Sequence, residues 1–352
     1  MLMAFGSGAA AAVDPMDRPA VHSRCATHAP LPPLFAPSAG DTAVAHLASL
    51  LAGDCSIEQL CLESCLISAR AGPALAAMLR VNTRLTLLDL CANSLHGEGL
   101  VCIAEALYHN RALRTLLVAD NHIDAAAAAV LQQLLERNAT LTSLDLSSNE
   151  LRSAGALAIG LALRVNSTLR VLSIRDNSLG DADAVEADDD AAAAARLGAL
   201  ETLLSALAHN AALEELDLSC NSLGAHWVAC CDFRSLLGAR EDVRANTESC
   251  MAKLGAALAV NSTLRRLVLR RNNLADSSMC ELAAGLAVNR SMLDIDVEAN
   301  EVRVEGLRVL FGALRQNSVL QSLNIRQNLL TAADLASLAV EQLRSGLRIL
   351  VD

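Results

Sequence analysis

The 352-residue sequence has few aromatic residues and almost no lysine. Phe, Trp and Tyr together make 2% of the chain, and Lys253 is the single lysine. Although 53% of the residues are hydrophobic, most of these are Leu, Ala and Val, which suit thin, regularly stacked layers better than one bulky core. The formal net charge is −11, whereas proteins that follow a phosphate backbone usually carry a basic surface. The composition therefore argues against nucleic-acid binding.

Signatures of membrane insertion, secretion and several common catalytic sites are also missing. No run of about 18 apolar residues is free of charge, and no basic stretch precedes the first apolar residues, as it would in a signal peptide. We find no phosphate-binding Gly-Lys-Ser/Thr loop, no Gly-x-Ser-x-Gly elbow and no His-Glu-x-x-His motif. We expect a cytoplasmic, non-enzymatic protein that needs no cofactor, metal ion or membrane.

Eleven cysteines occur without the regular spacing of a disulfide framework. Several lie within apolar runs, as Cys280 does, where a reduced thiol behaves as a small hydrophobic group. A zinc site formed by Cys220, His226, Cys230 and Cys231 is conceivable, but their spacing fits no common ligand pattern. The sequence favours reduced core cysteines, as in cytosolic proteins.

The most prominent feature of the sequence is a repeated motif. The pattern Leu-x-x-Leu-x-Leu-x-x-Asn-x-Leu recurs mostly in steps of 28 residues, and its copies begin at Ile57, Leu85, Leu113, Leu141, Leu169, Leu213, Leu264, Met292 and Leu320. Two longer steps leave insertions near residues 181–196 and 227–250. In each copy, apolar and polar residues alternate as in a short strand, and an Ala- and Leu-rich stretch with helical spacing follows. Internal periods of this size indicate a solenoid.

Two asparagines recur in nearly every copy. One follows each predicted strand, as Asn149 does, and the other ends each predicted helix, as Asn138 does. An amide side chain offers two donors and one acceptor, so we expect the first set to form a buried ladder that satisfies backbone groups of neighbouring copies. We expect the second set to cap the helices in the left-handed conformation.

The repeat resembles the ribonuclease-inhibitor-like class of leucine-rich repeats, and the arrays of NOD-like receptors and of Ran GTPase-activating protein. The similarity covers about residues 56 to 352. It implies an α/β leucine-rich-repeat horseshoe solenoid, with parallel strands on the concave face and helices on the convex face. Because such arrays mostly bind proteins, it also implies a protein partner. We predict a disordered Ala- and Pro-rich segment over 1–40 and a leucine-rich-repeat domain over 41–352.

The third, fifth and seventh residues of each copy should point outward from the concave face. Polar residues at these positions are our candidates for protein binding: Asp89, Asp145, Ser173, Arg175, Glu215, Asp217, Arg266, Arg270, Asp296 and Arg326. Fifth-position aspartates never occupy neighbouring strands, which either keeps like charges apart or forms an acidic stripe for a basic partner. Parallel register should place Arg266 against Asp294 and Arg270 against Glu298, so internal pairing is favoured over phosphate binding.

Two other functions remain as alternatives. One is a GTPase-activating protein for a small GTPase. The resemblance to Ran GTPase-activating protein implies an arginine that contributes to activation, and Arg70 lies near the edge of the first copy. The residues that flank Arg70 do not reproduce that family's arginine loop. The other is a structural subunit of a cytoskeletal or ciliary assembly.

Three further features invite interpretation. The acidic insertion after Gly180 is expected to be a solvated loop rather than a calcium or partner site, because it lacks the calcium-loop spacing. Trp227 either packs onto the helices or anchors a contact. The last copy, starting at Leu347, has no polar capping helix, so self-association through this C-terminal edge is a further expectation.

Overall fold

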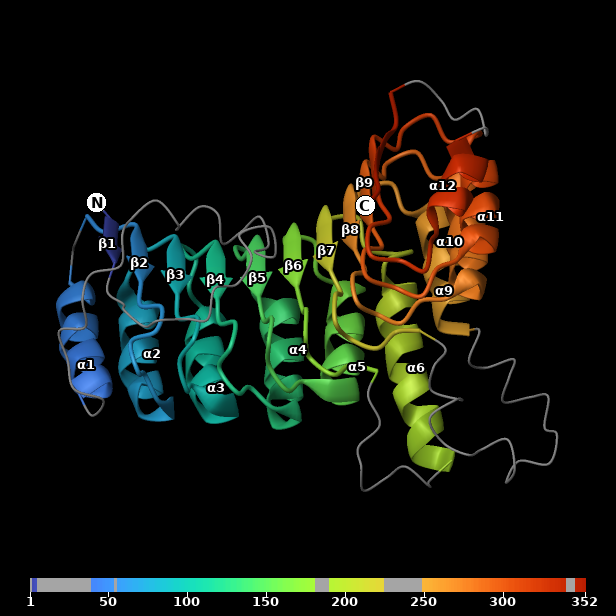
Figure 1. The fold of residues 1–352 in the computed structure, drawn as a ribbon. Helices are drawn as coiled ribbons and strands as arrows, with labels where there is room; N and C mark the ends of the chain where they lie inside the picture. The colour runs from blue at the N-terminus through green and yellow to red at the C-terminus, as the bar shows by residue number, and fades with distance from the viewer. Residues whose placement is uncertain (1, 5–38, 54–55, 181–189, 225–248, 340–345) are drawn as a thin grey trace. The chain divides into compact units, whose positions relative to one another are not determined.

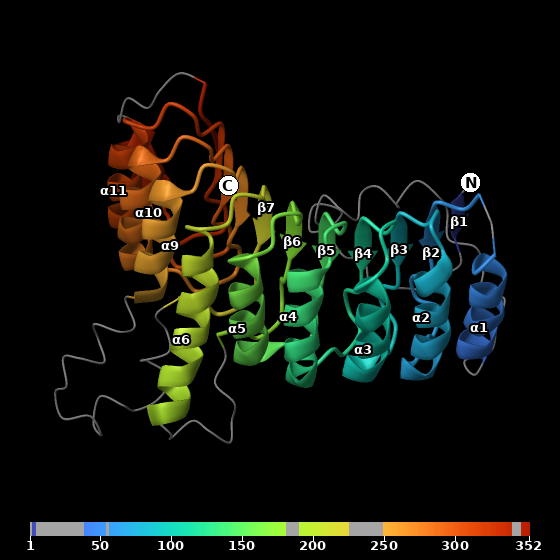
Figure 2. The ribbon, with the colours of Figure 1, turned by 180° about the vertical axis from the view of Figure 1, so that it is seen from behind.

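The computed structural model describes residues 2–4, 39–53, 56–180, 190–224, 249–339 and 346–352 (Figure 1). The chain divides into two compact units. Unit 1 contains Met1–Leu151 and Asn166–Asn177, and unit 2 contains Arg152–Val165 and Ser178–Asp352. In each unit, strands form one layer and helices form the other, as the views from both sides show (Figure 2).

Unit 1 contains six short parallel strands that pair in chain order. The strands are β1 (Leu2–Ala4), β2 (Gln59–Cys61), β3 (Leu87–Asp89), β4 (Thr115–Leu117), β5 (Ser143–Asp145) and β6 (Val171–Ser173). The helices are α1 (Ala39–Leu51), α2 (Gly72–Val81), α3 (His96–Leu107) and α4 (Ala128–Arg137), with 3-10 turns η3 (Ala69–Ala71) and η4 (Ala125–Ala127). From β2 to β6 the register advances by one repeat of 28 residues, so that Leu88 pairs with Leu116 and Leu116 with Leu144.

Unit 2 repeats the same arrangement. Its strands are β7 (Glu215–Asp217), β8 (Arg266–Val268), β9 (Asp294–Asp296), β10 (Ser322–Asn324) and β11 (Arg348–Leu350). Its helices are α5 (Arg152–Leu163), α6 (Asp190–Ala206), α9 (Ser249–Val260), α10 (Asp276–Val288), α11 (Val304–Leu314) and α12 (Ala332–Ala339). The predicted α/β solenoid of parallel strands and alternating helices is confirmed.

The leucines of the motif form the core between the two layers. In the copy that starts at Leu141, the side chains of Leu141, Leu144, Leu146 and Leu151 are all buried. Because successive strand residues point to opposite sides, the same alternation directs every third, fifth and seventh residue of a copy to the other side of the sheet.

The predicted asparagine ladder after the strands is confirmed. The Asn149 Nδ2 group donates to the carbonyl of Val118 in the preceding repeat, at 3.0 Å, and to that of Leu146 in its own repeat, at 2.8 Å. Its Oδ1 atom accepts hydrogen bonds from the backbone N–H groups of Asn121 and Ile123, at 3.1 and 2.9 Å. In unit 2, Asn300 makes the corresponding bonds. One buried amide therefore serves the backbone of two repeats.

The expected left-handed cap at the helix ends is wrong. Asn138 is extended, with φ −77° and ψ 126°. Its Nδ2 group donates to the carbonyl of Leu107 in the preceding repeat, at 2.7 Å, and its Oδ1 atom accepts from the N–H of Leu141, at 2.7 Å. The extended backbone lets the side chain reach a neighbouring helix end, so the helix ends form a second ladder. Positive φ occurs instead in the turn after the strand, for example at Ser148.

Both ends of the described chain differ in detail from expectation. At the N-terminal end, Leu2–Ala4 form a strand that pairs with β2, while residues 5–38 lie outside the described residues, so disorder there stays a prediction. At the C-terminal end, Ile349 pairs with Leu323, and Leu350 pairs with Asn324. The last repeat is therefore shifted from the expected alignment on Leu347, and a shift of one residue reverses which side chains face the core.

Glycine brings α9 and α10 unusually close together. A Cβ atom added at Gly285 would overlap the backbone carbonyl of Gly255, and one added at Gly255 would overlap the carbonyl of Glu281. A Cβ atom added at Gly312, in α11, would meet nothing within 4 Å. The first two glycines therefore allow a backbone approach that no other residue permits.

Asn149→Ala should destabilise the protein by more than about 1 kcal/mol, because it removes the ladder bonds of buried backbone groups in two repeats. Urea unfolding followed by circular dichroism would measure the loss. Ser148→Ala, at the exposed neighbouring position, is the control and should leave the unfolding midpoint nearly unchanged. Equal midpoints for Asn149→Ala and wild type would contradict the ladder.

Gly285→Ala should destabilise the protein by about 1–3 kcal/mol, because the added methyl group forces two packed helices apart. Gly312→Ala makes the same chemical change in open space and should be neutral or stabilising, by up to about 1 kcal/mol, because alanine has the higher helix propensity. Thermal unfolding of both variants tests the difference. A Gly285→Ala protein as stable as Gly312→Ala would show that the helices do not need the close approach.

Candidate functional site

The candidate site is the strand face, defined here as the third, fifth and seventh side chains of each repeat, on the side of the sheet away from the helices. Each unit has its own part of this face. These side chains are not part of the leucine core, and they vary from repeat to repeat. The ten candidate binding residues all lie on this face.

In unit 1, the expectation of exposed side chains is wrong for three candidates. Asp89, Asp145 and Ser173 are each at most 2% exposed. Parallel strands about 4.8 Å apart place side chains of the same position beside one another, which covers small side chains well. Arg175, at the seventh position after β6, is half-buried.

Asp145 lies in a compact polar cluster. Its Oδ1 atom accepts hydrogen bonds from the backbone N–H and the hydroxyl of Ser147, at 2.9 and 2.6 Å. The Oγ atoms of Ser147 and Ser173 lie 2.6 Å apart. Reversing the charge of so buried a carboxylate would disturb the fold itself, so Asp145 is a poor probe of binding.

An apolar cluster lies on the same face of unit 1. Cys91, Leu117 and Ala119 are buried together. Burial raises the pKa of the Cys91 thiol well above its usual value, and the nearby charges of Asp89 and Asp145 raise it further. This thiol is therefore protonated and unreactive at neutral pH.

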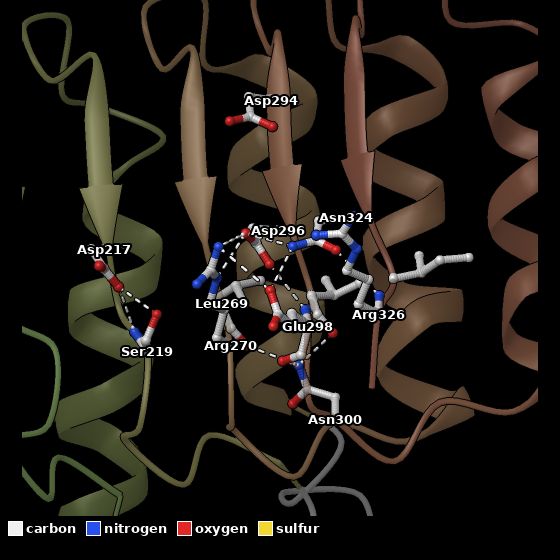
Figure 3. A network of polar contacts seen from close by, with 12 residues as sticks. Asp217, Ser219, Leu269, Arg270, Asp294, Asp296, Glu298, Asn300, Asn324 and Arg326 are labelled. Carbon is white, nitrogen blue, oxygen red and sulfur yellow. Dashed lines mark hydrogen bonds and ion pairs between the residues drawn. The ribbon is translucent and has the colours of Figure 1, made fainter. Parts of the chain in front are cut away.

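In unit 2, a network of charged groups spans β8 to β10 (Figure 3). The Arg270 Nε and Nη2 atoms both lie 2.8 Å from Asp296 Oδ2, and Nη2 lies 3.5 Å from Glu298 Oε2. Asn324 Nδ2 donates to Asp296 Oδ2 at 3.1 Å and to Glu298 Oε2 at 2.7 Å. One arginine and one amide therefore hold two neighbouring carboxylates together.

The predicted pairing of the two arginines is confirmed. Arg270 does contact Glu298, although its shorter contacts are to Asp296. Arg266 Nε lies 3.3 Å from Asp294 Oδ2, without hydrogen-bond geometry, and the two side chains are 39% and 35% exposed. The Arg270 network is mostly buried, whereas the Arg266 pair is a surface ion pair.

The fifth-position residues share a local role that the sequence analysis missed. Wherever the fifth position holds Asp or Asn, its side-chain oxygen accepts a hydrogen bond from the backbone N–H two residues later, at 2.9 to 3.2 Å; the residues are Asp89, Asp145, Asp217, Asp296 and Asn324. Asp and Asn commonly bond their own backbone in this way. The signal was available, because these positions hold Asp or Asn in most repeats. These side chains therefore order the ends of β3, β5, β7, β9 and β10.

Three strand-face candidates in unit 2 have fewer described contacts. Glu215 is half-buried on β7. Asp217, also half-buried, accepts from the hydroxyl of Ser219 at 2.6 Å. Arg326 is half-buried after β10, and its Nε donates to the carbonyl of Val351 at 3.4 Å. Unit 2 therefore presents charges of both signs that solvent can reach.

Most of the remaining candidates are exposed or lie outside the described residues. Arg70 is exposed in η3, and its backbone N–H donates to Ser68 Oγ. His226, Trp227, Cys230, Cys231 and most of the acidic insertion lie outside the described residues. Within the described ranges, no group of three or more His, Cys, Asp or Glu side chains is placed to hold a metal ion, and no helix there is long and apolar enough to cross a membrane.

The described cysteines are free of disulfides; Cys61, Cys91 and Cys250 are buried, as expected for core cysteines, whereas the core position expected for Cys280 is wrong. Burial is the main cause that raises the pKa of Cys65 to about 11 and that of Cys250 to about 12. Cys280 is exposed on α10. Thiolate chemistry at neutral pH is thus suppressed at the buried positions.

Comparison with known proteins agrees with the fold. A sequence profile described as "Leucine Rich repeat" matches residues 137–160, 165–186, 209–225 and 260–283. No curated protein sequence matches the chain. The chain contains leucine-rich repeats, while the ribonuclease-inhibitor-like subtype stays a prediction.

Three solved structures illustrate the likeness. The actin-binding site 2 of leiomodin-1 is 21% identical, over 53% of this chain and 79% of that one, with a TM-score of 0.31. Human 5T4, a trophoblast glycoprotein, is 18% identical over 68% and 69%, with a TM-score of 0.38. The tropomodulin C-terminal domain from Caenorhabditis elegans is 16% identical over 52% and 90%, with a TM-score of 0.33.

Arg270→Met should lower the free energy of unfolding by roughly 3 kcal/mol, because it leaves two neighbouring, mostly buried carboxylates without their cation. Arg266→Met is the matched control: its ion pair is exposed, so the loss should stay below about 1 kcal/mol. Urea unfolding at neutral pH compares the two. Similar small losses for both variants would show that the Arg270 network does not stabilise the unit.

Proposed function

We propose that this chain is a non-enzymatic scaffold or adaptor that binds a protein partner through its strand face. The observation that carries the proposal is the set of half-buried charged side chains on the strand face of unit 2. Leucine and asparagine at the other positions are needed to form each repeat, whereas the strand-face residues differ between copies. Such residues can give an array its individual specificity.

Prior ordering of these charges supports binding. Arg270 is held by two carboxylates, and Arg266 by one. Side chains that are already fixed lose less conformational freedom when a partner binds, so less of the interaction energy is lost. Exposed charges of both signs also steer encounter and select against partners with the wrong pattern.

A cytoplasmic location accords with this function, because the described cysteines are reduced thiols. A GTPase-activating role would rest on Arg70, which is exposed in η3, and no contact among the described residues bears on the cytoskeletal alternative. We therefore advance only the scaffold function.

The test uses a charge swap. Arg266→Asp breaks the ion pair with Asp294, and the double change Arg266→Asp/Asp294→Arg restores a pair with its signs exchanged. Partners captured from a cell lysate by the wild-type protein are identified by mass spectrometry, and the captured protein is then titrated against each variant. We expect both the single and the swapped variant to bind roughly tenfold more weakly than wild type. Charges at the rim of an interface act through their positions, and both variants place the wrong sign at residue 266.

The swapped variant separates binding from stability. Its restored ion pair should return the unfolding midpoint to near the wild-type value, while binding stays weak. A control pair on the helices of unit 1, Gln132→Arg/Glu136→Arg, should bind as wild type does. If the helix pair abolishes capture and the swapped variant does not, the strand face is not the binding surface.

A further inference from the structure

The outer face of the unit 2 helices exposes apolar side chains over several neighbouring helices. We call this surface the outer helix face and define it as the exposed residues of α5 and of the turn that follows it through Val165, together with those of α6, α9, α10 and α11. Its large apolar residues are between 36% and 66% exposed: Leu157, Leu161, Val165, Val260, Val288 and Val309. Contiguous apolar patches on a protein surface mark interaction sites.

The helices of unit 1 expose fewer large apolar side chains, namely Leu50 on α1, at 74%, and Val81 on α2, at 57%. There the corresponding helices carry polar contacts: Arg80 lies 3.9 Å from Glu105, and the Arg137 guanidinium lies 5.1 Å from the centre of the Tyr108 ring. One exposed valine, Val81, ends α2 among these charged groups. Exposed apolar side chains are therefore more numerous on unit 2 than the repeat itself requires.

The centre of the outer helix face is nearly continuous across α9 and α10. These helices approach closely at Gly255 and Gly285, and Figures 1 and 2 show them side by side. The exposed residues beside these glycines are small or apolar: Ala256, Val260, Cys280, Ala284 and Val288. Close helices with small outward side chains leave a flat surface that another flat surface can cover.

We propose that the outer helix face binds a second copy of this chain. The area suits a dimer. Five adjacent helices spaced about 9–10 Å apart and about 18 Å long present roughly 800 Å², which is about what each partner buries in a stable interface. The proposal is independent of the strand-face function, which uses the other side of the sheet.

The charges at the centre of this face, on α9 and α10, fit a second copy. The chain has a net charge of −11, so two copies repel one another unless they meet where that charge is absent. On the outward sides of α9 and α10, the one cation is Lys253, and Glu281 is a nearby anion. In a twofold dimer, if one residue of such a pair contacts the other residue in the second copy, the reverse contact forms as well. Lys253 of each copy can therefore meet Glu281 of the other.

The experiment measures oligomeric state by sedimentation equilibrium over micromolar concentrations. We expect the wild-type protein to dimerise, and Val260→Lys/Val288→Lys to be monomeric, with the dissociation constant raised at least roughly a hundredfold by burying unpaired charges. Both valines are more than half exposed, at 66% and 54%, so the variant should fold. Val81→Lys is the matched control, because Val81 occupies the same repeat position on unit 1, and it should dimerise as wild type does.

A charge exchange identifies the occupant. Lys253→Glu should weaken the dimer, and Lys253→Glu/Glu281→Lys should restore it, because both surfaces of a self-complementary interface change together. A third protein or a lipid surface would not follow that exchange.

Three results would overturn the proposal. The first is a wild-type protein that stays monomeric at every concentration, even if it binds vesicles or another protein through these valines. The second is a Val260→Lys/Val288→Lys variant that dimerises as wild type does. The third is a Val81→Lys variant that loses the dimer to the same extent as the double variant. Circular dichroism of each variant confirms that it is folded.

Discussion

The fold depends on buried asparagine side chains that complete the backbone hydrogen bonding of neighbouring repeats. Asn149 alone bonds backbone groups in its own repeat and in the preceding one. A single repeat therefore leaves polar groups unsatisfied, and each copy is stable only beside another. The helix-end asparagines impose the same dependence on the helix layer, where Asn138 bonds a carbonyl of the preceding helix end.

This constraint explains where the chain accepts insertions. Both long steps of the period occur after the twelfth residue of a copy, at Gly180 and Gly224, where the strand and its turn are complete. The ladder continues beyond each of these copies: the Gly180 N–H donates to the carbonyl of Asn221, and the Asn221 N–H donates to Asn272 Oδ1, at 3.0 and 2.9 Å. Extra residues before a helix leave these bonds intact, whereas extra residues within the strand would break the register.

The two outer surfaces of unit 2, the strand face and the outer helix face, differ in chemistry. Neither the strand face nor the outer helix face contributes to the leucine core, so both can vary. The strand face carries paired charges such as Arg270 and Asp296, which are fixed before any partner arrives. The outer helix face carries exposed Val260 and Val288, which gain from being removed from water. The two surfaces that we propose for binding, one polar and one apolar, thus lie on opposite layers.

The sequence by itself determined the repeat, the leucine core, the ladder after the strands and the pairing of Arg266 with Asp294, because a fixed period places equivalent residues of successive copies side by side. Only the tertiary structure decided how deeply each strand-face residue is buried. Asp145 and Asp217 occupy the same position in the motif, yet one is buried and the other half-exposed. It also decided the conformation of Asn138 and the shift that places Ile349 opposite Leu323. Burial and register depend on the neighbouring strands and helices together. The residue pattern of one copy does not show how closely the side chains of its neighbours cover it.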